Sequence, residues 1–205
     1  MPKGQPRAEQ AATTRRAILT AARRLFVEQG YFGTSTEEIV AEAGVGTRGA
    51  LYHHFADKRA LFLAVFEEVE RDLSAAGGGS RPEGDALDML RHGLHSFLDA
   101  AAVDPAVQRI VLIDGPAVLG WVTWRGLEEH YGLGLIRQAL DMGVAEGVIV
   151  VQPTEPLAHM LLAVVDEAAL YIANSPHKRR ARIETSRALD LFLDGLRPVR
   201  GLASC

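Results

Sequence analysis

Residues 30–62 read GYFGTSTEEIVAEAGVGTRGALYHHFADKRALF, and this stretch decides the fold of the N-terminal part of the chain. Ser35 begins a short helical segment, and Glu38 follows it at the spacing of a capping box. That segment ends at Gly44, and a second short segment starts at Thr47. Two short helices joined by a glycine-containing turn form a helix-turn-helix, whose second helix is able to enter the major groove of DNA.

The apolar residues of this stretch are expected to form its core rather than to contact a partner. Ala43 is small where the two helices must approach each other, and Gly44 relieves the turn. The remaining apolar residues would pack the helices together. They are Ile39, Val45, Leu51 and Phe55.

The rest of the chain has the apolar spacing of amphipathic helices. Thr13 or Thr14 would cap the first helix, and Gly30 would end it. Residues 148–151 have the composition of a strand but no evident partner strand. The predicted fold class is therefore all-α, with a three-helix helix-turn-helix domain, a larger helical domain and about nine helices. Later helices are predicted over residues 58–73, 85–103, 105–115, 117–146 (with a break near Gly132 and Gly134 left open), 154–175 and 178–196.

We expect three parts along the chain. Residues 1–12 would be a basic flexible tail, residues 13–60 the helix-turn-helix domain, and residues 61–200 the larger helical domain. The stretch Gly77-Gly78-Gly79-Ser80-Arg81-Pro82 is typical of a flexible connection, and the helix before it would bridge the two domains.

The charge of the chain is distributed unevenly. The net charge is −4, yet residues 1–60 hold nine Lys and Arg against six Asp and Glu, while the remainder holds 13 against 20. A basic N-terminal part on an acidic body indicates a polyanionic partner, although a solvated basic tail is the simpler interpretation of the charge alone.

Composition also bears on the compartment and on cofactors. Cys205 is the only cysteine, so no disulfide forms within the chain. By its sequence, no apolar run is expected to approach the roughly 18 residues of a membrane span, and the first ten residues lack the apolar core of a signal peptide. We therefore expect a cytoplasmic protein with no membrane contact, no cofactor and no metal site.

Residues 13–66 resemble the TetR (tetracycline-repressor-like) family of transcriptional regulators, whereas the later two-thirds match that family only in helical character and length. One departure is Gly46, which makes the turn one residue longer than the family's commonest form and leaves the start of the second helix open by about one position. The elements that carry the resemblance are Thr14-Arg15-Arg16, Leu25-Phe26, Gly30-Tyr31, Thr34-Ser35, Ala43-Gly44-Val45, Leu51-Tyr52-His53-His54-Phe55, Lys58 and Leu61-Phe62.

The resemblance implies contacts to double-stranded DNA. Hydroxyls at a helix start, such as those of Ser35 and Thr36, suit an anionic oxygen. Arg48 is able to fork onto guanine, although a lone exposed arginine is more often a solvated charge. The implied phosphate contacts are Thr36, Tyr52, His54 and Lys58, and the expected base-reading residues are Thr47, Arg48, Gly49 and, more weakly, His53.

Two of these residues have a second interpretation. The Tyr52 ring is able to pack while its hydroxyl binds phosphate. His53 and His54 are adjacent, so their side chains point about 100° apart on a helix and do not easily share one metal ion.

The resemblance also implies a homodimer and a small-molecule effector. The last two helices, about residues 154–175 and 178–196, would form the dimer surface. A twofold dimer implies a palindromic operator with half-sites roughly 34 Å apart. Core packing alone would also explain the apolar pattern of these two helices.

The middle helices would enclose the effector pocket, because aromatic side chains with a few polar groups are what such a cavity needs. Plainer interpretations remain open: Trp121 and Trp124 as a core stripe, His159 as an interior histidine, and either Asp166 or Glu167 as a solvated charge. The candidate residues are Trp121, Trp124, His130, Tyr131, Met142, His159, Asp166, Glu167 and Tyr171.

Other functions have less support in the sequence. There is no glycine-rich phosphate loop, nucleophile elbow or zinc-protease motif, so we do not expect an enzyme. His92 and His95 lie three apart and could bind a metal with an acidic partner, but a solvated face explains them as well. A ligand-independent architectural DNA-binding protein remains the main alternative. The family resemblance favours a repressor over an activator.

Overall fold

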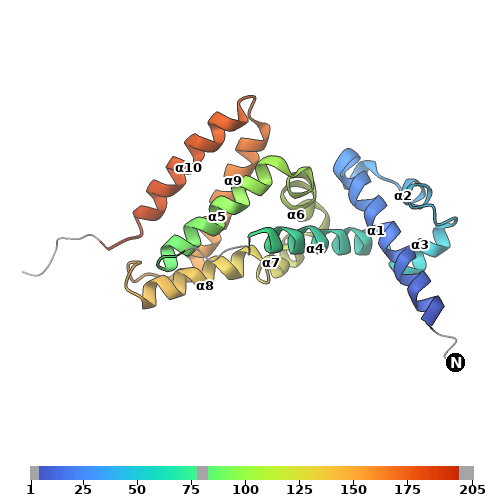
Figure 1. The fold of residues 1–205 in the computed structure, drawn as a ribbon, viewed down its shortest axis with the longest axis horizontal. Coiled ribbons are helices and arrows are strands. Elements are labelled where there is room, and N and C mark those ends of the chain that lie inside the picture. Colours follow the sequence, from blue (N-terminus) through green and yellow to red (C-terminus); the bar gives the residue numbers. More distant parts are fainter. Residues whose placement is uncertain (1–4, 78–82, 199–205) are drawn as a thin grey trace, which may run out of the picture. The chain divides into compact units, whose positions relative to one another are not determined.

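The structure is a computed structural model, and it describes residues 5–77 and 83–198. In these residues there are ten α-helices, one π-helix and no strand, which confirms the all-α class (Figure 1). Residues 148–151 form bends and coil, as expected for a strand without a partner. The elements are α1 (Gln5–Gly33), α2 (Thr36–Ala43), α3 (Arg48–His54), α4 (Lys58–Gly77), α5 (Ala86–Val103), η1 (Val107–Asp114), α6 (Gly115–Leu119), α7 (Trp121–Glu128), α8 (Gly132–Ala145), α9 (Thr154–Asn174) and α10 (Lys178–Asp194).

The chain divides into two compact units whose bounds differ from the predicted ones. The first unit holds residues 1–71 together with 105–121, and the second holds 72–104 together with 122–205. The boundary predicted at residue 60 lies within the first unit, in which residues 105–121 pack with the N-terminal part. The predicted connection after Gly77 and the cysteine at the end of the chain fall outside the described residues.

Aromatic side chains form the centre of the first unit. Phe26, Phe62 and Phe66 are fully buried, and the ring centroids of Phe26 and Phe62 lie 5.4 Å apart. Gly115 contacts this core closely, since a Cβ there would lie 3.0 Å from Phe66 Cε2. The start of α4 and the segment from η1 to α6 therefore belong to the same core as α1.

The helix that was predicted to end at Gly115-Pro116 instead continues to Leu119. The π-helical η1 passes directly into α6, and Pro116 takes a place in the first turn of α6. Proline has no backbone N–H to donate, and the change from π-helix to α-helix falls at this point. Gly120, with φ of 75°, ends the run.

The first helix starts earlier than predicted. It begins at Gln5, so residues 5–12 are helical rather than a flexible tail. Its first turns are rich in alanine, which favours helix more than any other residue. Thr13 does not cap the helix, because its hydroxyl donates to the Glu9 carbonyl at 2.9 Å inside it. Gly30, with φ of 74°, breaks the helix where predicted.

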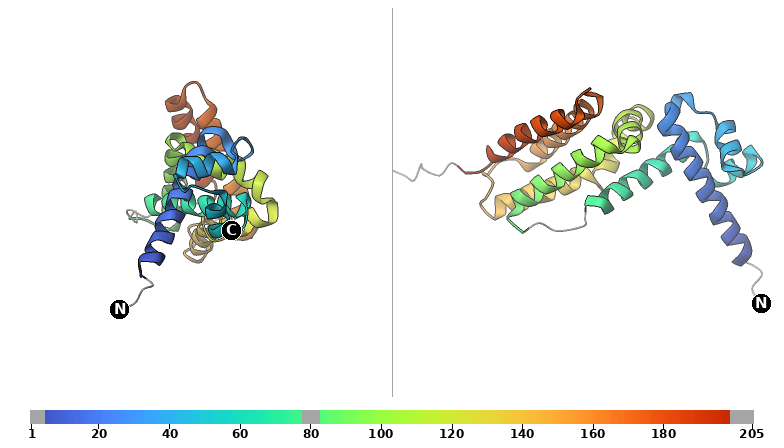
Figure 2. Two further views of the ribbon diagram at one scale, coloured as in Figure 1. Left: turned by 90° about the vertical axis from the view of Figure 1, so that its right-hand side faces the viewer. Right: turned by 45° about the horizontal axis from the view of Figure 1, so that its top comes forward.

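The second unit is a bundle in which α5, α8, α9 and α10 lie side by side (Figure 1 and Figure 2). Leucines spaced along one face of α5 meet apolar residues of the other three helices, as the 3.6-residue period requires. The buried side chains include Leu87, Leu94, Leu98, Leu133, Leu140, Leu161, Val165, Ile172, Leu189 and Leu193.

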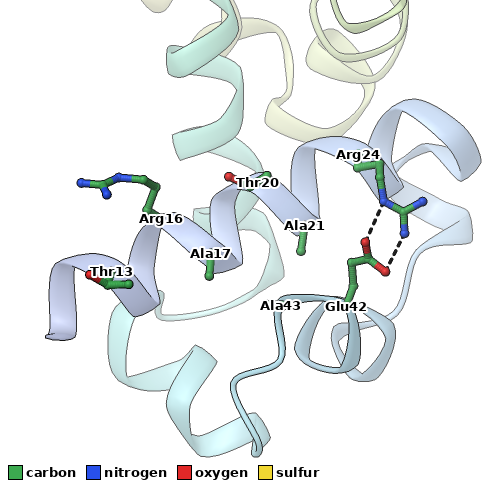
Figure 3. Close-up of a pocket in the computed structure, with 8 residues that line it drawn as sticks. All are labelled: Thr13, Arg16, Ala17, Thr20, Ala21, Arg24, Glu42 and Ala43. Atoms are coloured by element: carbon green, nitrogen blue, oxygen red, sulfur yellow. Dashed lines mark hydrogen bonds and ion pairs between the residues drawn. The ribbon is translucent and has the colours of Figure 1, made fainter.

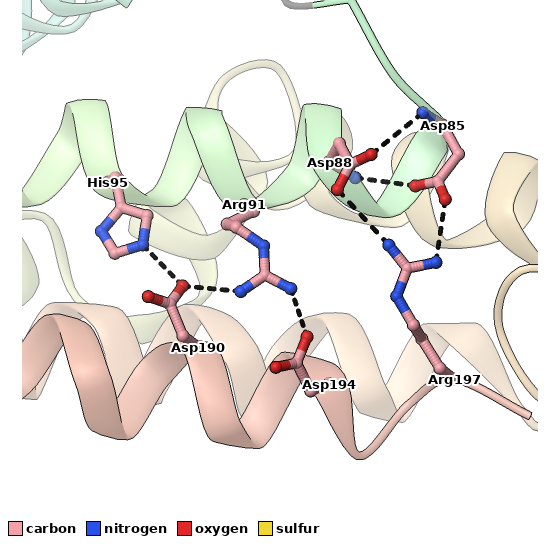
Figure 4. A network of polar contacts seen from close by, with 7 residues as sticks. All are labelled: Asp85, Asp88, Arg91, His95, Asp190, Asp194 and Arg197. Atoms are coloured by element: carbon pink, nitrogen blue, oxygen red, sulfur yellow. Dashed lines mark hydrogen bonds and ion pairs between the residues drawn. The ribbon is translucent and has the colours of Figure 1, made fainter. Parts of the chain in front are cut away.

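Ion pairs join α5 to α10 along the edge of this bundle (Figure 4). Arg91 binds Asp190 at 2.7 Å and Asp194 at 2.6 Å. His95 Nε2 lies 2.9 Å from the same Asp190 carboxylate. His92 is exposed, whereas His95 lies in the seam beside Asp190. This seam is an ion-pair network rather than the metal site considered from the sequence.

One helix is more apolar than the sequence analysis recognised. Over its 21 residues, α9 is long and apolar enough to cross a membrane by length and composition, with a mean hydropathy of 1.4 in its most apolar window. The expectation that no stretch reaches this length is therefore wrong. The core helix of a water-soluble bundle passes the same test, and α9 buries Leu161, Val165 and Ile172 against its neighbours.

Candidate nucleic-acid interface and effector region

Ser35 begins α2 as its N-cap, as the sequence predicts. Its Oγ accepts a hydrogen bond from the Glu38 amide at 3.2 Å, and the Glu38 carboxylate accepts one from the Ser35 amide at 2.7 Å. These bonds satisfy donors that the start of a helix leaves unpaired. The Ser35 hydroxyl also donates to Glu38, so a phosphate contact from Ser35 would compete with the cap.

Two glycines shape the turn between α2 and α3. Gly44 and Gly46 have φ of 65° and 78°, a left-handed conformation that glycine adopts without steric cost. Thr47 follows in an extended conformation and caps α3, because its Oγ accepts from the Ala50 amide at 3.3 Å. The recognition helix, α3, therefore starts at Arg48, which settles the position that Gly46 had left open.

The apolar residues predicted to join α2 and α3 do so. Ile39 and Leu51 are fully buried and Phe55 is nearly so, whereas Val45 is half-buried in the turn. The Arg15 guanidinium carbon lies 5.2 Å from the Phe55 ring centroid, at a distance typical of a cation–π contact. The pair α2–α3 is thus held from behind by its own core and by α1.

The outer side of α3 carries three of the residues predicted to read bases, Arg48, Gly49 and His53, and one predicted to bind phosphate, Tyr52. Arg48, Gly49, Tyr52 and His53 are exposed, and their positions i, i+1, i+4 and i+5 share one side of a helix. His54 is half-buried, and Lys58 is half-buried at the start of α4. Thr36 is only 8% exposed, so a phosphate contact through its hydroxyl has little room in this state.

The Arg48 side chain is held by a carboxylate that the sequence analysis did not single out. Arg48 Nη1 lies 2.7 Å from Glu37 Oε1, and its guanidinium carbon lies 5.9 Å from the Tyr52 ring centroid. The pKa of the Tyr52 phenol is lowered, first by its hydrogen bond with Arg48 and then by that with Thr36. The exposed face of α3 is therefore an ordered set of polar groups.

Lys58 has an intramolecular partner instead of an open position. Its Nζ donates to the Tyr31 carbonyl at 2.5 Å and lies 4.1 Å from the Tyr31 ring centroid. Burial lowers the pKa of the Lys58 ammonium, while the carboxylates of Glu38 and Asp114 act in the opposite direction. Lys58 thus closes the C-terminal end of α1, where a cation also suits the helix dipole.

Two open hollows flank the α2–α3 pair. The first, about 400 Å³, lies between α1 and the end of α2, where Arg24 reaches Glu42 (Figure 3). It was missed from the sequence, although Thr13, Arg16 and Thr20 recur at helical spacing on α1. The second, about 460 Å³, is lined by Glu37, Val40, Ala41, Gly44, Gly46, Thr47 and Arg48.

In the second unit, two of the predicted effector residues are buried or largely buried. Trp124 is 6% exposed on α7, and the Arg125 guanidinium carbon lies 4.3 Å from its ring centroid. Burial raises the pKa of Asp166 on α9 to about 7, and the charge of Arg125 opposes that rise. Glu128, which the sequence analysis did not single out, is also buried on α7.

The other predicted effector residues have different surroundings. His130, Glu167 and Tyr171 are exposed in the second unit, and Trp121 is exposed at the end of the first. Tyr131, Met142 and His159 are half-buried. These four exposed side chains are not placed to line an interior cavity of their own unit. A helix whose neighbours cover only a narrow stripe of its surface exposes the residues beside that stripe, even those three or four positions from a buried residue.

Two stretches of the chain match families of regulatory proteins. Residues 18–65 match the family described as "Bacterial regulatory proteins, tetR family", and residues 87–196, more than half of the chain, match the "Tetracyclin repressor-like, C-terminal domain" family. The chain belongs to the TetR family.

Individual TetR-family proteins give the same result. A TetR-family transcriptional regulator from Pectobacterium atrosepticum is 32% identical, with a TM-score of 0.71 over 92% of this chain and 96% of that one. The HTH-type transcriptional regulator AcrR of Shigella flexneri is 39% identical over 47% of this chain and 45% of its own. The HTH-type transcriptional repressor Rv1474c of Mycobacterium tuberculosis is 39% identical over 38% and 42%. The matched stretch spans about half the length of these curated relatives.

TetR-family membership indicates the class of protein. The matched families are regulatory proteins, which agrees with the expectation of a regulator rather than an enzyme.

Glu129, Glu155 and His159 have ligand atoms within 4.8 Å of one another. Arg137 Nη1, however, lies 3.0 Å from Glu129 and 3.1 Å from Glu155, so a guanidinium supplies the positive charge. His159 is therefore part of a surface ion-pair cluster.

Proposed function

We propose that this TetR-family protein is a ligand-responsive transcriptional repressor. It binds a palindromic operator in double-stranded DNA as a homodimer and releases the operator when a small molecule binds its second unit. The observation that carries the proposal is the capped α3, whose outer side offers Arg48, Gly49, Tyr52 and His53 to a partner. An α-helix of this kind fits the major groove, which is about 12 Å wide.

The DNA contacts divide into base reading and phosphate binding. Thr47, Arg48 and Gly49 at the start of α3, with His53 one turn later, read base edges. Arg48 forks onto the O6 and N7 of a guanine, and Gly49 lets the backbone approach closely. Tyr52, His54 and Lys58 bind phosphates together with Ser35 and Thr36 at the start of α2. For these contacts a DNA phosphate must replace the partners that the side chains have within the protein: Glu38 for Ser35, Glu37 for Thr36 and the Tyr31 carbonyl for Lys58.

The last two helices, α9 and α10, form the homodimer surface. They expose large apolar side chains at helical spacing, although each also buries a stripe in its own bundle. Apolar patches of this kind on a water-soluble protein mark interaction sites. The exposed residues are Met160, Val164 and Tyr171 on α9 and Ile183, Leu191 and Phe192 on α10.

The effector site lies beside Trp124, Arg125 and Asp166. An aromatic ring, a guanidinium and a carboxyl with a pKa near neutrality give a small molecule both stacking and hydrogen-bonding partners. Effector binding favours a dimer whose recognition helices no longer fit successive grooves, with a coupling of about 1–3 kcal/mol. We place the protein in the cytoplasm, where the operator is.

The test is binding of the purified protein to DNA from around its own gene, followed by footprinting. We expect a protected palindrome that is bound at least 1,000-fold more tightly than scrambled duplex of the same length, at the low end of the range for specific binders. A thermal-shift screen of small molecules then identifies compounds that stabilise the protein and release the operator. Equal binding of operator and scrambled DNA, unaffected by every compound, would favour the architectural alternative.

A further inference from the structure

Four side chains of the helix-turn-helix, those of Thr36, Glu37, Arg48 and Tyr52, form a polar cluster. The Thr36 hydroxyl donates to Glu37 Oε2 at 3.1 Å, and Glu37 Oε1 lies 2.7 Å from Arg48 Nη1. The guanidinium carbon of Arg48 lies 5.9 Å from the Tyr52 ring centroid, so Tyr52 stands beside the same guanidinium. The cluster joins the start of α2 to the exposed side of α3, and it borders the hollow lined by Thr47 and Gly46.

Glu37 is the carboxylate of α2 that faces the recognition helix. Glu38 is engaged with Ser35 in the capping box, and Glu42 with Arg24 on α1. The pKa of Glu37 is lowered, first by a hydrogen bond from its own backbone amide, then by that from Thr36 and by the charge of Arg48. Glu37 is thus ionised and fixed at both carboxylate oxygens.

This arrangement leaves most of the guanidinium free for DNA. Arginine has five N–H donors in a planar fork, and a bidentate contact to guanine uses two of them. Glu37 holds the guanidinium from one side, and the Tyr52 ring lies beside it. Holding the guanidinium before binding reduces the entropy that Arg48 loses when it meets a base.

We infer that Glu37 is a positioning residue that sets the sequence specificity of this regulator. It orients Arg48 toward a base edge, and it occupies a guanidinium N–H that would otherwise be available to a phosphate oxygen on any sequence. The inference rests on the base-reading role proposed for Arg48. Phosphate contacts carry no sequence information. Specificity is the difference between the affinity for the operator and the affinity for other DNA, so weakening the non-specific complex increases the specificity.

The test compares Glu37→Gln with the unmodified protein on the footprinted palindrome and on scrambled duplex over a range of salt concentrations. We expect scrambled duplex to bind several-fold more tightly, with a log–log salt slope steeper by about 0.9, because Arg48 gains one phosphate contact. The discrimination at the base pair under Arg48 should fall by roughly 5-fold or more. Because Glu37 is 57% exposed, the variant should keep its thermal stability.

Glu42→Gln is the matched control, since it removes the same charge from the same helix outside the polar cluster. It should change the affinity for both duplexes alike and leave the base preference intact. Arg48→Ala alone and combined with Glu37→Gln complete a double-mutant cycle. If Arg48→Ala alters base preference but Glu37→Gln acts equally with and without Arg48, the Glu37 inference is overturned and the base-reading role stands. If Arg48→Ala leaves base preference unchanged, both are overturned.

Discussion

The backbone amide of Tyr31 donates a hydrogen bond to Asp114, which stands 83 positions later in the chain, at 2.7 Å between N and Oδ2. Arg109 Nε binds the same oxygen at 3.2 Å, and the Arg109 guanidinium lies against Gly30, where any Cβ would overlap it. Asp114 is only 2% exposed. The C-terminal end of α1 is therefore anchored to η1 by one buried carboxylate.

Removing that carboxylate should destabilise the first unit. We expect Asp114→Ala to lower the free energy of unfolding by about 1–3 kcal/mol, because the Tyr31 amide and the Arg109 guanidinium lose a buried acceptor. Asp114→Asn keeps one acceptor oxygen and should lose less. Urea denaturation measures both variants. A stability of Asp114→Ala equal to that of the unmodified protein would contradict the anchoring role.

Replacing Lys58 should affect both stability and DNA binding. Lys58→Ala removes the hydrogen bond to the Tyr31 carbonyl, so we expect a loss of about 0.5–1.5 kcal/mol in the free energy of unfolding. If Lys58 also binds a phosphate, the log–log salt slope for DNA binding should fall by about 0.9 for operator and scrambled duplex alike. A normal salt slope with reduced stability would leave Lys58 only its structural role.

The sequence predicted the helix-turn-helix closely because its signals are local. Ser35 and Glu38 stand three apart, and Thr47 needs only the amide of Ala50 to cap α3. Local signals gave a wrong prediction at Gly115-Pro116, because this dipeptide is typical of a helix end when its neighbours in space are not considered. Phe66 fills the space beside Gly115 from a distant part of the chain, and no local pattern records that contact.

The candidate sites were predictable to different degrees for the same reason. Exposure of Arg48 and His53 follows from helical period once the core face is known. The Glu37–Arg48 ion pair depends on how α2 and α3 cross, so it required the structure. In the effector region, Trp121 and Trp124 stand three apart, yet one is 64% exposed and the other 6%. Period alone does not say which edge of an apolar stripe a neighbouring helix covers.

Substitution of Gly49 should separate folding from binding. Gly49 is the second residue of α3 and has no positive φ, and a Cβ there would meet only Thr47 Oγ1, at 3.7 Å. Alanine favours a helix more than glycine does, and the difference is smaller in the first turn than in a helix interior, so Gly49→Ala should raise the free energy of unfolding by less than about 1 kcal/mol. If the backbone of α3 approaches base edges here, the same methyl group should weaken operator binding severalfold, as anisotropy titration would detect. Unimpaired operator binding would exclude close approach at Gly49.

Asp166 should make stability depend on pH. Its pKa of about 7 lies above its ordinary value of 3.8, so the folded chain keeps a proton that the unfolded chain has lost. The free energy of unfolding should therefore fall as pH rises from about 4 to about 7, and stay low above that range. We expect Asp166→Asn to remove this decline and to exceed the unmodified protein at pH 8 by roughly 1–4 kcal/mol.

Denaturation at pH 5 and pH 8 measures the difference between the Asp166→Asn variant and the unmodified protein. Glu167→Gln is the matched control, because Glu167 is the next residue of α9 and is exposed. It should leave the decline with pH in place. If Asp166→Asn and Glu167→Gln showed the same pH dependence, burial would not govern the protonation of Asp166.

A charge on α10 should dissociate the proposed dimer. Leu191 is 74% exposed on α10, and burying an aspartate in an apolar interface is unfavourable because the carboxylate loses its hydration. We expect Leu191→Asp to raise the dimer dissociation constant roughly 100-fold, which corresponds to about 2.7 kcal/mol. Leu135→Asp is the control, since Leu135 is 60% exposed on α8, outside the proposed surface. Sedimentation measures the oligomeric state of both variants. If α9 and α10 form the dimer surface, only Leu191→Asp should be monomeric. The same oligomeric state in both variants would contradict that surface.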